Sequence, residues 1–137
     1  MPVLFHHEDV EYTIPDNQKL EKWLIDIAIA ENKEILNINY IFCSDEYLLN
    51  INKEYLDHDF YTDIITFPYK EGKQIESDIF ISIDRVIENA KTYKTAIEHE
   101  LLRVIAHGLL HLLGYGDKSE EESLKMSAME EQCIAKF

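Results

Sequence analysis

TAIEHELLRVIAHGLLHLLGYGD, the stretch at residues 95–117, decides how this chain folds. Apolar residues from Ile97 to Leu113 cover almost the whole circumference of a helix, as expected of a helix that is buried on most sides. The run Thr95-Ala96-Ile97-Glu98 has the Thr-x-x-Glu pattern of a capping box, which predicts the start of the helix. Gly114 follows the last apolar residue, where a glycine is the usual left-handed stop.

One polar stripe interrupts this apolar surface at steps of three and four residues, formed by Glu100, Arg103, His107 and His111. Such a stripe is costly on a buried helix unless its members have partners. His107 and His111 are four residues apart, so they project from one helix face about 6 Å apart along the axis. This spacing lets two imidazoles converge on one metal ion.

The glycines after the helix bring a third ligand within reach. Gly114 and Gly116 allow the chain to turn back, which carries Asp117 toward the imidazole pair. Two neutral imidazoles and a carboxylate suit Zn²⁺, with nickel, cobalt or manganese as alternatives if a fourth position is open. We therefore predict one divalent metal ion, with zinc the expected one. The alternative is that both histidines are hydrogen-bonded core residues and that Asp117 belongs to the next helix start.

Residues His107 to Tyr115 resemble the signature of the YbeY family, bacterial metal-dependent endoribonucleases and rRNA maturation factors. That signature reads His-Gly-x-Leu-His-Leu-x-Gly-Tyr-Asp-His, and here Gly116-Asp117 replaces the final Asp-His pair. Asp117 thus stands in for a third histidine, which zinc tolerates because carboxylate oxygen binds it at about 2.0 to 2.2 Å. Further blocks of the family are similar to residues 52–55 (NKEY), 62–67 (TDIITF) and 77–82 (SDIFIS).

The resemblance implies a single-strand-specific endoribonuclease that processes ribosomal RNA. Its implied roles are late maturation of small-subunit rRNA and ribosome quality control, with the small ribosomal subunit and assembly factors as partners. His107, His111 and Asp117 are the implied metal ligands, with one coordination position left for water or a phosphate oxygen. The sequence shows no clear general base, so the catalytic residues stay unassigned.

One departure from the family concerns the substrate. An arginine thought to contact the substrate phosphate usually follows the tyrosine of the NKEY block, and this chain has Leu56 there. Arg103, His58 and Lys53 are candidates for that cationic role. Arg103 fits an ion pair with Glu100 or another carboxylate equally well.

Two aspartates in the family blocks, Asp63 and Asp78, are open to two interpretations. An aspartate beside a strand often caps a turn or pairs with a cation, and the alternative is that it reaches the nearby site. His58 and Asp59, in the loop before Asp63, are further candidates for the cleft.

Two other functions compete with RNA cleavage. A His-x-x-x-His pair on a helix is also the core of metallopeptidases, but those enzymes need a glutamate directly after the first histidine, where this chain has Gly108. A ribosome-assembly adaptor would use the metal only to staple its fold. Structural zinc sites close with four protein ligands, and Cys133 is the only soft candidate for the fourth.

Composition limits the remaining possibilities. A chain of 137 residues with 46% hydrophobic content predicts one metal-dependent hydrolase-like domain over residues 1–137. No signal peptide or membrane span is apparent, and Cys43 and Cys133 lie far apart, so we expect a cytoplasmic protein with reduced thiols. A net charge of −14 argues against strong binding to free RNA, so we expect weak, salt-sensitive binding and delivery of the substrate by the ribosome. Glu130 and Glu131 are expected on a solvated face of the last helix.

The order of predicted elements is α+β, a small mixed sheet of about four strands covered by helices. Alternation and β-branched residues predict strands at 3–6, 35–43, 64–68 and 75–83, the last two joined as a hairpin around Gly72. The inward positions of the second strand are expected to be Leu36, Ile38, Tyr40 and Phe42. Helices are predicted at 16–31, 44–55 and 84–93, and after a capping box at Ser119.

Overall fold

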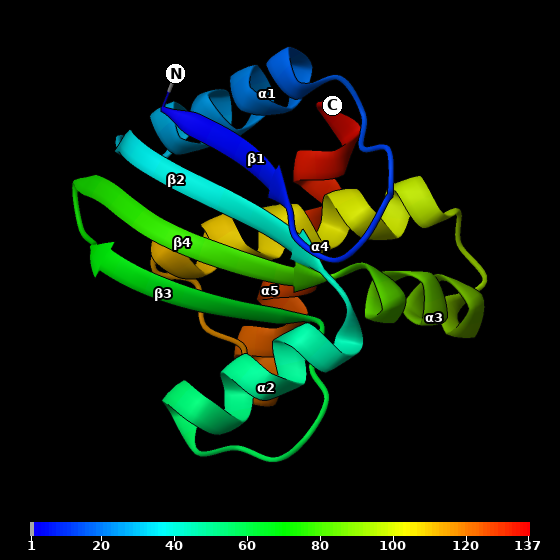
Figure 1. Cartoon of the computed structure of the whole chain (residues 1–137). Coiled ribbons are helices and arrows are strands. Elements are labelled where there is room, and N and C mark those ends of the chain that lie inside the picture. The colour runs from blue at the N-terminus through cyan, green and yellow to red at the C-terminus, as the bar shows by residue number, and fades with distance from the viewer. Residues whose placement is uncertain (1) are drawn as a thin grey trace.

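The computed structural model describes residues 2–137 and confirms the α+β order (Figure 1). Its four strands are β1 (Val3–His7), β2 (Glu34–Cys43), β3 (Ile64–Lys70) and β4 (Gln74–Ser82). Its five helices are α1 (Asn17–Ala30), α2 (Asp45–Leu56), α3 (Ile83–Tyr93), α4 (Ile97–Leu112) and α5 (Glu120–Ala135). The predicted elements are therefore all present, with bounds that differ by one or two residues.

The strands form one mixed sheet in the order β1-β2-β4-β3. β1 and β4 run parallel to β2 on either side of it, whereas β3 pairs with β4 in the antiparallel direction. The hairpin between β3 and β4 turns at Gly72, whose φ of +92° suits glycine. As Figure 1 shows, α4 crosses the back of this sheet, with α5 beyond it.

The inward face of β2 was predicted correctly at three of its four positions. Ile38, Tyr40 and Phe42 have no exposed surface, and the Tyr40 hydroxyl donates to the Ile105 carbonyl of α4 at 2.9 Å. The inward position predicted for Leu36 was wrong, because Leu36 is 37% exposed while its neighbour Ile35 is 8% exposed. The pairing of β2 with β4 shifts register between Ile35 and Asn37, and a bulge of this kind reverses the side-chain alternation.

The start of α4 also differs from the prediction. The residue that precedes the helix is Ala96, and it makes no side-chain capping bond, so the expected capping box at Thr95 does not form. By contrast, Ser44 caps α2 through the Tyr47 backbone N–H, and Ser119 forms the predicted capping box with Glu122. What holds α4 in place is burial, since Leu101, Ile105 and Leu109 have no exposed surface.

The main core lies between the sheet and the helices α1 and α4, and it contains most of the buried apolar residues. A smaller cluster on the other face is built on Cys43, Leu48 and Ile65, where α2 packs against the sheet. Over the part of the chain that the structure describes, no helix combines the length and the apolar character needed to cross a membrane.

Candidate metal centre

His107, His111 and Asp117 lie together at the end of α4, as their spacing predicted. Their potential ligand atoms all lie within 4.8 Å of one another. Asp117 Oδ2 lies 3.4 Å from His107 Nε2 and 3.3 Å from His111 Nε2. The two imidazole rings meet at 86° with their centroids 4.5 Å apart, so their edges converge instead of stacking.

A glycine-dependent turn brings Asp117 to the histidines. Gly114 has a φ of +108°, a conformation that other residues rarely adopt. The Tyr115 backbone N–H donates to the Leu110 carbonyl at 3.0 Å, which closes the end of the helix. The Tyr115 hydroxyl donates to Glu31 of the loop after α1, so the turn is fixed at its outer end as well.

The hydrogen bonds of the two histidines leave the same ring nitrogen free in each. His111 Nδ1 lies 3.0 Å from the Tyr115 carbonyl oxygen, and His107 Nδ1 lies 2.5 Å from Glu130 Oε2. A carbonyl or carboxylate oxygen only accepts, so Nδ1 donates in each ring, and Nε2 is the ring atom that faces Asp117 and would bind a cation. Ligand histidines are held in this way in metal sites, so these residues fit a divalent cation.

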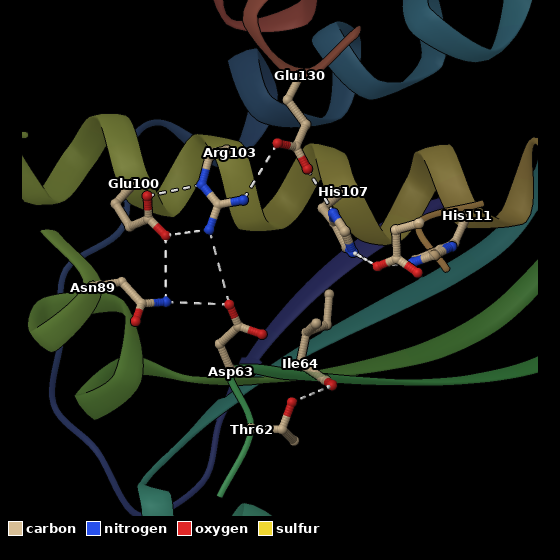
Figure 2. A network of polar contacts seen from close by, with 10 residues as sticks. Thr62, Asp63, Ile64, Asn89, Glu100, Arg103, His107, His111 and Glu130 are labelled. Atoms are coloured by element: carbon tan, nitrogen blue, oxygen red, sulfur yellow. Dashed lines mark hydrogen bonds and ion pairs between the residues drawn. The ribbon is translucent and has the colours of Figure 1, made fainter. Parts of the chain in front are cut away.

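The Glu130 carboxylate is shared between a histidine and an arginine (Figure 2). Its Oε2 faces His107, whereas its Oε1 accepts from Arg103 at 3.3 Å. Glu130 is 3% exposed, so the expected solvated position was wrong. The signal was available in the sequence: Met126, Glu130 and Cys133 recur at helical spacing, and all three are buried on one face of α5.

Arg103 is surrounded by carboxylates from three elements. Its guanidinium donates through Nη2 and Nε to Glu100, which is 1% exposed, and lies 3.9 Å from the Asp63 carboxylate (Figure 2). The bond to Glu100 raises the pKa of Arg103 above its ordinary range. The ion pair considered for Arg103 in the sequence is therefore present, and most of its donors are engaged.

Asp63 lies immediately before β3, where it accepts from the Asn89 amide at 3.2 Å. Burial raises the pKa of this carboxyl, against the lowering effect of Arg103 and His107. Asp63 thus borders both the buried network and the cleft. Asp78 lies elsewhere, bonded to Asn39 and Tyr69 on the outer part of the sheet.

A cleft of about 370 Å³ opens in front of the three candidate ligands. The rest of its lining comes from the end of α2, the loop that follows and the start of β3, and includes Leu56, His58, Phe60 and Asp63. Of the predicted substrate contacts, His58 lines this cleft and Arg103 does not. Lys53 is paired with Asp59 at 3.3 Å, outside the lining.

Neither competing function gains support from the geometry. A Cβ on Gly108 would lie 2.9 Å from Ile64 Cδ1, so a side chain there points into the sheet and cannot place a peptidase base beside the ion. Within residues 2–137, the one group of His, Cys, Asp and Glu that could hold a metal contains three ligands, and Cys133 is not among them. Three protein ligands leave a position open, as catalytic metal sites do.

Fold and site together define a small α+β protein with a candidate His-His-Asp metal-binding site at the end of a buried helix. The family model described as "Endoribonuclease YbeY" matches residues 4–137. The chain therefore belongs to the YbeY family, as its motifs predicted.

Relatives and a solved structure agree with this family. An Endoribonuclease YbeY of Cytophaga hutchinsonii is 51% identical over 134 residues, which are 97% of this chain and 94% of that protein. Another, of Flavobacterium johnsoniae, is 47% identical over 133 residues, 97% of this chain and 95% of that protein. The solution structure of TM1509 from Thermotoga maritima matches with a TM-score of 0.65 and 26% identity, over 96% of this chain and 86% of that one.

Proposed function

We propose that this chain is a metal-dependent endoribonuclease that cleaves single-stranded RNA during the processing of ribosomal RNA. The observation that carries the proposal is the convergence of two histidine Nε2 atoms on Asp117 Oδ2, at 3.4 and 3.3 Å. Membership of the YbeY family supports the reaction and the class of substrate. We extend the proposal to late maturation of small-subunit rRNA and ribosome quality control, with the small subunit and assembly factors as partners.

His107, His111 and Asp117 would hold one divalent ion, for which we propose Zn²⁺ because two imidazoles and a carboxylate suit it. When bound, such an ion supplies Lewis acidity toward a phosphate oxygen and water. The chain itself contributes orientation. Glu130 and the Tyr115 carbonyl hold the two rings with Nε2 facing Asp117, and the cleft in front of them would receive the RNA.

The test is cleavage of a labelled single-stranded RNA by the wild type and by Asp117→Ala, with the bound metal of each quantified. We expect about one ion per chain and cleavage in the wild type, and loss of both in the variant. Asp59→Ala is the matched control, since it removes an exposed carboxylate close to the cleft but outside its lining. Retention of the metal without cleavage of RNA, even with ribosomes present, would favour the adaptor function.

A further inference from the structure

Part of the lining of the cleft beside the metal centre is apolar and aromatic. It contains Leu56, at the position where the family carries its arginine, and Phe60. Both side chains reach the surface, with 40% and 55% of their areas exposed. The lining residues include no lysine and no arginine. A phosphate in this cleft therefore meets no lysine or arginine side chain that would hold the strand.

The Phe60 ring is held in place by a neighbouring ring. Its ring stacks on the His58 ring with centroids 5.1 Å apart and an angle of 24° between the planes. The neighbouring ring, Tyr61, is already engaged because its hydroxyl donates to Glu46 at 2.5 Å. The exposed ring of Phe60, by contrast with that of Tyr61, is not anchored to another side chain by a hydrogen bond.

One buried residue, Asn52, fixes the loop that carries His58 and Phe60. Asn52 is 2% exposed, and its amide donates to the Phe60 carbonyl at 2.9 Å. The backbone carbonyl of Asn52 also accepts from the backbone N–H groups of Asp57 and His58. Bonds at the start of the loop and at Phe60 hold the segment that carries the two rings in place before a ligand arrives, which lowers the entropy cost of binding.

We propose that Phe60, supported by His58, is a stacking platform for one unpaired nucleobase of the RNA that enters the cleft. The inference rests on the proposed nuclease function and identifies how the substrate is recognised. Every base has a π-face, so an aromatic ring holds single strands without sequence preference and needs no positive charge. That mode of binding suits a chain with a net charge of −14 whose cleft wall carries leucine at position 56. It also selects single strands, since paired bases do not offer a free face.

The experiment compares Phe60→Ala and Phe60→Trp with Tyr93→Ala. Tyr93 is a suitable control because it is 63% exposed and lies at the end of α3, outside this cleft. The probe is a single-stranded RNA that carries 2-aminopurine, whose fluorescence is quenched when it stacks. Binding is measured in an Asp117→Ala background that does not cut, and KM and kcat are measured with Asp117 intact. Metal content is measured for each variant with Asp117 intact to confirm that the centre is unchanged.

We expect Phe60→Ala to weaken binding and raise KM by about 5- to 150-fold, the effect of losing one stacked base. The kcat value should stay within about twofold, because the contact exists equally in the ground and transition states. The loss should be the same at low and high salt, and Phe60→Trp should restore quenching. Equal quenching and equal KM in Phe60→Ala and Tyr93→Ala would overturn the platform. If the wild type cleaves no RNA, the nuclease function fails, and the quenching measured in the Asp117→Ala background still decides whether Phe60 stacks a base.

Discussion

Glu130 Oε2 lies 2.5 Å from His107 Nδ1, so a carboxylate from the last helix orients a candidate metal ligand on α4. The same carboxylate accepts from Arg103, which is bonded in turn to Glu100. The metal centre is therefore one end of a buried polar network. This arrangement explains how a mostly apolar helix can carry a polar stripe, since each member of the stripe has a partner.

Replacing Glu130 should weaken metal binding without removing a ligand. We expect Glu130→Gln to lower metal affinity by about 10- to 100-fold, because the partner that fixes the His107 ring loses its charge. A competition titration against a chelator measures this. Glu131→Gln, a neighbour on α5 whose side chain is 64% exposed, should bind metal as the wild type does. Equal affinities in the two variants would refute the orienting role.

Arg103 should matter chiefly for stability. Arg103→Met leaves Glu100 and Glu130 buried without a counter-charge, and breaking a buried ion pair in this way costs about 3–5 kcal/mol of unfolding free energy. Urea denaturation measures the loss. The exposed Lys22 pairs with Asp26 on α1, and Lys22→Met should change stability by less than about 1 kcal/mol. Similar losses in both variants would mean that the buried network contributes little.

The turn at Gly114 should couple backbone conformation to metal binding. Gly114→Ala forces an alanine to a φ of +108°, and we expect a loss of about 1–3 kcal/mol of stability. Gly72→Ala meets a similar strain at a φ of +92° in the distant hairpin, so it should cost a comparable amount. Only Gly114→Ala should also reduce metal affinity, because only that turn positions Asp117. Thermal unfolding with and without metal separates the two effects.

The thiol of Cys43 should be unreactive in the folded protein. Burial raises the pKa of this thiol from 9.0 to about 12, and the nucleophile in alkylation is the thiolate. We expect no labelling of Cys43 at pH 8 until the chain unfolds, with mass spectrometry identifying the modified site. A folded-state pKa above the unfolded one stabilises the protein at low pH, so the contribution of Cys43 should be lost as pH rises from 9 toward 12. Cys43→Ala should flatten that part of the stability profile, and an unchanged slope would contradict the assignment.

Much of the fold was predictable because local patterns record burial. Ile38, Tyr40 and Phe42 alternate along β2 as a half-buried strand requires, and His107 and His111 share a helix face by spacing alone. The alternation did not predict the exposure of Leu36, because a bulge against β4 reverses the alternation there. A bulge depends on the partner strand. Thr95 has a capping pattern, but the helix begins later and the side chain makes no capping bond.

The ligands were predictable from sequence, whereas the residues that support them were not. Glu130 follows His107 by 23 positions, and its contact with the histidine depends on how α5 docks against α4. The same holds for Asn52, because its hydrogen bond to the Phe60 carbonyl depends on the conformation of the loop. Periodicity shows that Glu130 faces inward, but it does not reveal which side chain Glu130 meets.

The position of Glu130 on α5 has a thermodynamic consequence. Since the carboxylate that orients His107 belongs to the C-terminal helix, loading of the centre and docking of that helix are linked equilibria, and each must favour the other. Cation concentration should then control how often α5 detaches, and protease digestion of its backbone should slow as the centre fills. The C-terminal helix thereby reports whether the metal centre is occupied.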